Sequence, residues 1–346
     1  VCIVTLGLIF RAPLLSFIFG NVDADVMDNS MVYFFYTVLS YPFIALYDAG
    51  ASIFRAQENT RGPMVISIIS NVMNIGGNAV LIWVFHMGVA GAAISTLVSR
   101  IFCAVVVLYQ LRKDRQPIVV RDYLKIRPDG NMIKRILALG VPSGVENSMF
   151  QLGKILVLSL VTSFGTASIA ANAVSNNIAM FAVLPGMSIG FAMLTVSAQC
   201  VGAGDFEQVK YYTKKLMKLT YICLILMNIL VVLLLPFIIK VYGLSAEASE
   251  YARRILIYHS CCVVTIWPLS FSLANTLRAA ADVKYTMILA IVSMWTFRIG
   301  FSYILGSYLK WGVFGIWVAM TIDWLFRSIC FTIRYLGGKW KHASLV

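Results

Sequence analysis

The 346-residue chain is too hydrophobic for a soluble protein. Hydrophobic residues make up 60% of it and charged residues only 12%, whereas a soluble domain carries about 25% charged residues. The mean hydropathy is +0.84. These values exclude a soluble domain and indicate an integral membrane protein, although the formal net charge is +13.

Long uncharged stretches divide the chain into membrane crossings. Residues 62–99 and 155–204 contain no Asp, Glu, Lys or Arg, and one helical crossing takes roughly 20 residues. Barrel strands would alternate apolar and polar residues, which these runs do not. We therefore predict an all-α protein with crossings at 1–20, 30–54, 64–86, 88–111, 133–160, 166–200, 210–239, 251–277, 285–309 and 312–336.

The chain also resembles itself at a shift of about 223 residues, with one added residue near its end. The matches are Pro13 with Pro236, Gly20 with Gly243, Arg55-Ala56 with Arg278-Ala279, Met64 with Met287, Gly77 with Gly300, Gly88 with Gly312 and Gly91 with Gly315. Duplicated halves are typical of membrane carriers. Because fewer crossings precede the middle than follow it, we expect two further helices before Val1.

The repeat and the charges predict three regions. Residues 1–111 form the last four helices of an N-terminal lobe, residues 112–132 form a linker, and residues 133–346 form a six-helix lobe with a short tail. Most Lys and Arg residues fall in the linker and in loops on its side of the membrane, which is cytoplasmic by the positive-inside rule. The linker and the C-terminus are therefore expected inside a cell membrane, and no nucleic acid partner is expected.

The residues offer no sign of an enzyme or a resident cofactor. The seven cysteines lie in or beside apolar segments, and the three histidines are far apart, so neither a disulfide nor a metal site is expected. No nucleotide-binding loop, Gly-x-Ser-x-Gly motif or catalytic triad occurs. An ion gradient of H⁺ or Na⁺ is the simplest energy source for such a carrier.

Charged residues within the crossings are the first candidates for function, because burying them is costly. Asp323 and Arg327 lie four residues apart, so they either pair on one helix or take part in transport. Arg298 has a similar predicted depth, which suggests a clamp between Arg298 and Asp323. Glu146 lies near the predicted mid-membrane without a partner on its own helix. It should therefore favour its neutral form and exchange a proton, which makes Glu146 and Asp323 the candidate ion-coupling residues.

Polar and flexible side chains near Glu146 suggest a pathway for a substrate. Amides either line a wet cavity or join helices, and methionines adapt to varied apolar ligands or fill gaps. Pro185-Gly186 should kink its crossing. The candidate cavity residues are Asn147, Gln151, Asn172, Asn176, Asn177, Met180, Met187 and Arg298.

Several segments resemble the MATE (multidrug and toxic compound extrusion) family. Residues 55–63, 68–74 and 88–93 resemble its fourth-to-sixth-helix region, residues 139–146 are also similar, and 164–205 resemble its eighth helix and the following loop. The resemblance implies twelve helices in two six-helix lobes around a cavity, with efflux coupled to inward H⁺ or Na⁺ flow. Many bacterial members carry a coupling Asp on the first helix, which has no counterpart here. Some carry an acid one turn after Glu146, where this chain has Phe150.

We therefore expect an antiporter, most simply a monomer, that exports drugs or other small organic, often cationic, compounds. A related flippase for lipid-linked glycans remains an alternative and would favour a strongly cationic cavity. A multi-spanning transferase would need an acid-base or nucleophile cluster near one interface, and the sequence shows none.

Overall fold

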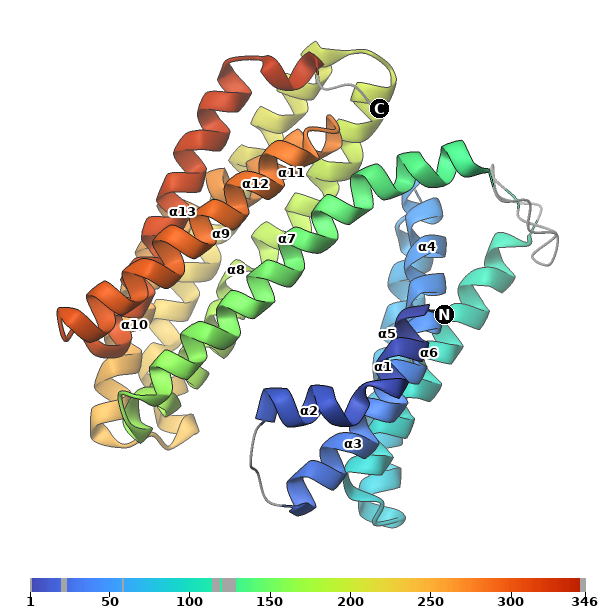
Figure 1. The fold of residues 1–346 in the computed structure, drawn as a ribbon. Coiled ribbons are helices and arrows are strands. Elements are labelled where there is room, and N and C mark those ends of the chain that lie inside the picture. The colour runs from blue at the N-terminus through green and yellow to red at the C-terminus, as the bar shows by residue number, and fades with distance from the viewer. Residues whose placement is uncertain (1, 20–23, 58, 114–118, 120–128, 343–346) are drawn as a thin grey trace. The chain divides into compact units, whose positions relative to one another are not determined.

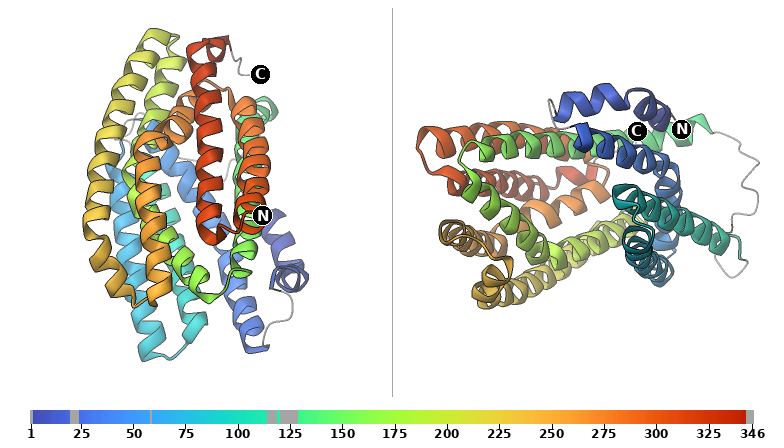
Figure 2. Two further views of the ribbon diagram at one scale, coloured as in Figure 1. Left: turned by 90° about the vertical axis from the view of Figure 1, so that its left-hand side faces the viewer. Right: turned by 90° about the horizontal axis from the view of Figure 1, so that it is seen from below.

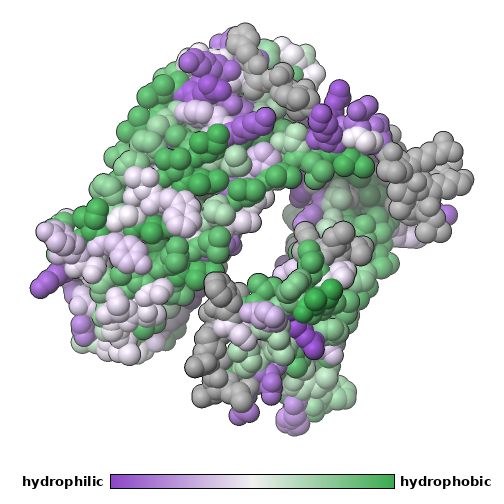
Figure 3. Space-filling view, viewed as in Figure 1, coloured by the Kyte–Doolittle hydropathy of each residue, from purple (hydrophilic) through white to green (hydrophobic). Residues whose placement is uncertain are grey.

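The computed structural model describes residues 2–19, 24–57, 59–113, 119 and 129–342, so most of the predicted linker lies outside the described residues. All regular structure in those ranges is helical (Figure 1), which confirms the all-α membrane fold. The chain divides into two compact units, Val1–Arg127 and Pro128–Val346. Hydrophobic residues cover the middle of the helices, and hydrophilic residues gather near their ends (Figure 3).

The first unit is built around α6. Its elements are α1 (Cys2–Ile9), α2 (Arg11–Phe19), α3 (Ala24–Leu39), α4 (Tyr41–Ala56), α5 (Arg61–Ala79), the π-helical turn η1 (Val80–Val84) and α6 (Gly88–Leu111). Helices α3, α4 and α5 all pack against α6. Phe54, Ile66, Val107 and Leu111 form the core between α4, α5 and α6, each with almost no exposed surface.

The predicted crossing 1–20 is wrong as a single helix. The structure breaks it after Ile9, and α2 begins at Arg11. Pro13 explains the break, because it has no N–H to donate to the carbonyl of Ile9 and its ring crowds that carbonyl.

The second unit is a bundle whose long helices run side by side (Figure 2). Its elements are α7 (Gly130–Thr162), α8 (Thr166–Gly202), α9 (Phe206–Tyr242), α10 (Ala246–Thr265), η2 (Pro268–Ser272), α11 (Leu273–Ala279), α12 (Val283–Ser293), η3 (Met294–Gly300), η4 (Ser302–Tyr308), α13 (Gly312–Leu336) and η5 (Lys339–His342). Asp129, Asp205 and Ser245 cap α7, α9 and α10 by accepting hydrogen bonds from first-turn N–H groups. Elements η2, η3 and η4 are π-helical and η5 is a 3₁₀ turn.

Prolines act differently on two helices of this unit. Pro268 cannot donate to the carbonyl of Val264, and the segment Pro268–Ala279 is bent by 56° from α10. In contrast, α8 continues as one helix on both sides of Pro185. A Cβ atom added to the next residue, Gly186, would lie 2.5 Å from the Trp267 ring, so this glycine permits a close approach of η2 to α8.

Seven helices of the described chain are long and apolar enough to cross a membrane, or eight if the bent pair around Pro268 counts as one crossing. Two of the ten predicted crossings are outside this set. One is the broken segment at 1–20. The other is α7, whose 33 residues span about 50 Å at 1.5 Å per residue but include Glu146 and Lys154.

The duplication inferred from the sequence recurs in the local geometry of the two units. The turn before α6 and the turn before α13 both place non-glycine residues at positive φ, with His86 at 52° and Lys310 at 57°. The glycines that follow have similar angles, 52° at Gly88 and 59° at Gly312. These four residues match at a shift of 224, so the repeat conserves an unusual turn conformation.

A helix-to-helix hydrogen bond recurs in the same register. In the first unit Ser70 Oγ donates to the carbonyl of Ser99 over 3.2 Å. In the second unit Ser293 Oγ donates to the carbonyl of Asp323, also over 3.2 Å. The serines are related by 223 residues and the acceptors by 224, as the inserted residue requires.

Candidate functional site

The interior of the second unit holds three charged side chains on two adjacent segments. Arg298 lies on η3, whereas Asp323 and Arg327 lie on α13. Asp323 is completely buried, and the two arginines are 9% and 4% exposed. π-Helical segments such as η3 are often found at functional sites. We take this cluster as the centre of the candidate site.

Asp323 is held by its own helix and by α12. Its Oδ2 atom lies 3.2 Å from Arg327 Nη2, which is the i, i+4 pair that the sequence suggested. The Ser293 hydroxyl, whose proton is shared with the Asp323 carbonyl, donates a hydrogen bond to its Oδ1 atom. Both carboxylate oxygens therefore have partners, and this makes an ionised Asp323 tolerable in the interior.

The predicted clamp between Arg298 and Asp323 is wrong as a direct contact. Asp323 lies within the electrostatic reach of Arg298, but among the described residues its salt bridge is to Arg327. The guanidinium of Arg298 instead lies 5.0 Å from the centre of the Phe150 ring on α7. The predicted depth of Arg298 in the membrane does not indicate in which direction its side chain points from η3.

The cations of this cluster contact aromatic rings rather than further acids. The ammonium of Lys154 lies 4.9 Å from the same Phe150 ring, and Arg327 lies 4.6 Å from the ring of Phe271. Each cation–π contact contributes about 0.5–2 kcal/mol. The Nε atoms of Arg298 and Arg327 are buried without a hydrogen-bond partner in the described structure. Arg298 and Arg327 thus share one carboxylate, that of Asp323, so the buried cluster carries excess positive charge.

Glu146 is not the lone acid that the sequence suggested. Its Oε1 atom lies 2.6 Å from Arg278 Nη2 on α11, and Arg278 also donates to Asn275 Oδ1 over 3.1 Å. Arg278 stands at the end of α11, in a position that the sequence analysis assigned to a loop. Helix α7 begins at Gly130, and its first turns lie at an angle to the rest (Figure 1). A residue count from a predicted span boundary therefore gave no sign of this partner.

The predicted amides separate into one structural group and one exposed group. Asn172 is buried, and its Oδ1 accepts a hydrogen bond from Trp317 Nε1 over 3.1 Å, which joins α8 to α13. Asn176 donates to the carbonyl of Asn172, and Asn147 donates to that of Ser143. Asn147, Asn176, Asn177 and Gln151 are exposed within the second unit.

Met180 and Met187 lie on the same exposed face of α8 as Asn176 and Asn177. They are seven residues apart, which is two helical turns, and are 67% and 43% exposed. This face of the unit is available to a ligand or to another part of the assembly. Neither methionine contributes to the buried charged cluster.

Several residues in and around the site were not predicted from the sequence. Phe150 lies four residues before Lys154, a spacing that places an aromatic ring beside a cation on one helix face and that offered a usable signal. His259 is buried between Trp317 and Trp324, with ring centroids 5.3 and 5.6 Å away, and no sequence pattern points to it. Among the described residues, no group of three His, Cys, Asp or Glu side chains is placed to hold a metal ion.

Two family models match the chain. The model described as MatE matches residues 142–304, and the model described as Lipid II flippase MurJ matches residues 1–126. The probable multidrug resistance protein YoeA of Bacillus subtilis is 28% identical over the whole chain, which covers 75% of that protein. The probable multidrug resistance protein NorM of Thermotoga maritima is 23% identical, with 95% of this chain and 71% of that protein covered.

Solved structures share the fold. A MATE in complex with MaL6 matches with a TM-score of 0.88 at 19% identity, and an outward-facing multidrug resistance MATE transporter matches with 0.87 at 19%. Each match covers 99% of this chain and 76% of the other. The sequence relatives extend over both units, and the helical fold agrees with them. The chain is therefore similar, in sequence and in fold, to the multi-pass membrane transporters of the MATE family.

Proposed function

We propose that this chain is part of a cation-coupled antiporter that exports small organic compounds. Similarity to the MATE family and to relatives named as probable multidrug resistance proteins supports export of such compounds. The observation that carries the coupling proposal is a fully buried carboxylate, Asp323, inside a membrane unit. The proposed setting is the cytoplasmic membrane, with a monomer whose linker and C-terminus face the cytoplasm.

A carboxylate couples transport to an ion when binding of that ion changes its partners. For Asp323, an arriving H⁺ or Na⁺ would compete with Arg327 and Ser293, which belong to different helices. For Glu146, the ion would compete with Arg278 and free α7 from α11. Both acids are therefore proposed as coupling residues, each through the opening of an arginine pair.

The test is efflux of ethidium, a fluorescent organic cation, from cells that carry the full-length gene and lack other efflux pumps. The H⁺ and Na⁺ gradients are collapsed separately. We expect efflux to stop when one of the gradients is lost. Efflux that persists after both gradients are collapsed would contradict the antiporter proposal.

Two variants then locate the coupling acid. Glu146→Gln removes one carboxylate, and the double variant Asp323→Asn/Arg327→Gln removes the other together with its partner. We expect at least one of them to lose the gradient dependence of efflux. Glu207→Gln is the matched control, because Glu207 is an exposed acid paired with Lys210. Wild-type behaviour of both test variants would exclude both residues.

A flippase for lipid-linked glycans is the second candidate. The match of the flippase model to residues 1–126 and the excess of cations around Arg298 favour it. Translocation of a fluorescent lipid-linked glycan in vesicles that contain the full-length protein distinguishes the two functions. Glycan movement without ethidium export would replace the antiporter proposal.

A further inference from the structure

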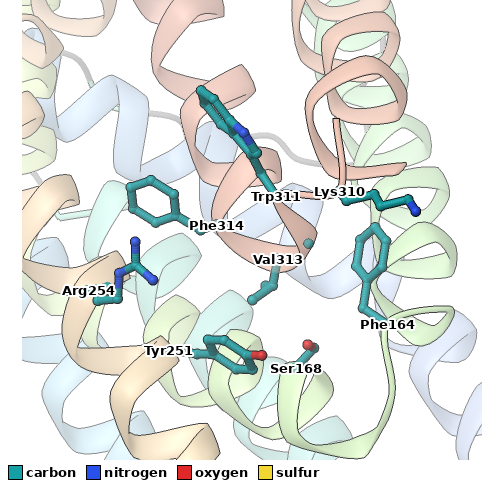
Figure 4. A pocket seen from close by; sticks show the side chains of 9 residues that line it. Phe164, Ser168, Tyr251, Arg254, Lys310, Trp311, Val313 and Phe314 are labelled. Carbon is teal, nitrogen blue, oxygen red and sulfur yellow. The ribbon is translucent and has the colours of Figure 1, made fainter. Parts of the chain in front are cut away.

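A pocket of about 620 Å³ opens in the second unit at the end where α8 and α13 begin (Figure 4). This end is opposite to the start of α7, and the predicted topology places it on the outer side of the membrane. Aromatic side chains from four segments form much of the wall, namely Phe164, Tyr251, Trp311 and Phe314. None of the candidate transport residues lines it.

Two cations line this pocket without an acidic partner. Arg254 comes from α10 and Lys310 from the turn before α13, and neither forms a salt bridge within the described residues. The guanidinium of Arg254 lies 5.3 Å from the centre of the Phe314 ring. The nearby acid Glu247 accepts a hydrogen bond from Tyr251 over 3.0 Å. The pocket therefore has a net positive lining.

Backbone dipoles add to this charge. Helices α8 and α13 both begin at the pocket, and their N-cap residues, Gly165 and Trp311, provide no side-chain cap. First-turn N–H groups at such helix ends attract anions. Ser168 is 4% exposed, has no hydrogen-bond partner in the described structure, and points into the pocket (Figure 4). Its hydroxyl is an unused donor for an anion.

The repeat shows that these cations are not needed to build the fold. In the first unit His86 and Met87 occupy the positions that correspond to Lys310 and Trp311, and the turn has similar φ angles. Met31 corresponds to Arg254 at the shift of 223. The matching turn thus forms without this pair of cations, which points to a role in binding.

The surroundings of the pocket suit an amphiphile. Tyr308 and Leu309, directly before Lys310, are 82% and 46% exposed, and Trp311 is 51% exposed. Trp and Tyr at helix ends are typical of the membrane–water interface, where basic residues attract anionic headgroups. A charged pocket beside exposed apolar side chains matches a phosphate joined to acyl chains better than it matches a free anion.

We propose that this pocket binds the phosphate of an anionic phospholipid headgroup. Arg254 and the Ser168 hydroxyl hold the phosphate oxygens, Lys310 adds positive charge at the opposite side of the pocket (Figure 4), and the exposed side chains before Lys310 contact the acyl chains. The bound lipid joins α8, α10 and α13 at one end of the second unit, and it should therefore stabilise that unit.

The test is thermal unfolding of the purified full-length protein in detergent, titrated with phosphatidylglycerol, phosphatidylcholine or soluble glycerol phosphate. We expect only phosphatidylglycerol to raise the midpoint. The variant Arg254→Gln/Lys310→Asn should bind it roughly thirty-fold more weakly, because each basic residue contributes to anionic lipid binding. Asn is chosen because it tolerates the positive φ of residue 310.

Arg253→Gln is the matched control, since it removes the same charge one residue away and outside the pocket lining. It should keep the wild-type response, and the single variants Arg254→Gln and Lys310→Asn should each lose part of it. Equal stabilisation by phosphatidylcholine, or an unchanged response of all pocket variants, would overturn the proposal. Full stabilisation by glycerol phosphate would make the pocket a site for soluble anions instead.

Discussion

Asp323 is the most deeply buried charge in the second unit, and two arginines depend on it. Arg327 makes a direct pair with it, and Arg298 interacts with it over a longer distance. Removing one partner of a buried pair leaves the other charge without compensation, which costs about 3–5 kcal/mol. Removing both partners avoids most of that cost.

Asp323→Asn should therefore lower the thermal midpoint of the purified full-length protein sharply, because the buried cations lose their carboxylate. The double variant Asp323→Asn/Arg327→Gln should recover part of the loss. Thermal unfolding in detergent measures both changes, with the single variant Arg327→Gln completing the cycle. Strictly additive effects of the two substitutions would show that the pair contributes no coupling energy.

At the scale of elements, tight contacts between neighbouring helices depend on glycine. A Cβ atom added to Gly315 on α13 would lie 2.8 Å from the carbonyl carbon and oxygen of Leu305 on η4. The matching addition at Gly91 on α6 would meet the Leu81 carbonyl of η1 at 3.2 Å. The repeat thus brings α13 close to η4 and α6 close to η1 in the same way. The contact between α13 and η4 is the tighter of the two.

Substitution by alanine should destabilise the protein more at Gly315 than at Gly91. Gly315→Ala forces a backbone shift and should cost about 1–3 kcal/mol, and Gly91→Ala should cost less. Gly76→Ala is the control, because its Cβ would meet nothing within 4 Å. Thermal unfolding ranks the three variants. A Gly315→Ala protein as stable as the Gly76→Ala protein would contradict the contact geometry.

At the scale of the whole molecule, the distribution of basic residues predicts one orientation in the membrane. Lys113 and Lys284 belong to loops on the cation-rich side, and His86 and Lys240 belong to the opposite side. The positive-inside rule places the first pair in the cytoplasm. Both units contain helices long and apolar enough to cross the membrane, so each provides its own test of orientation.

Cysteines introduced one at a time at these four positions, in a protein whose seven native cysteines are changed to Ser or Ala, report that orientation. An impermeant maleimide added to intact cells should label His86→Cys and Lys240→Cys. Lys113→Cys and Lys284→Cys should react only after the membrane is opened. The reverse pattern would place the linker and the C-terminus outside.

Composition and local chemistry determined much of this protein from the sequence alone. The absence of charge over long stretches requires burial in lipid, which permits helices because they satisfy their own backbone hydrogen bonds. The repeat matched Gly88 with Gly312, and the described turns before α6 and α13 have similar φ angles. The i, i+4 pair of Asp323 and Arg327 also follows from helix geometry.

Only the tertiary structure decided the partners of Glu146 and Arg298. Glu146 meets Arg278 across 132 positions of sequence, and Arg298 turns toward Phe150 on α7. Such contacts depend on how helices rotate and bend, and residue counts from a predicted span boundary do not contain that information. The phosphate pocket likewise exists because α8, α10 and the turn before α13 supply its lining residues Ser168, Arg254 and Lys310.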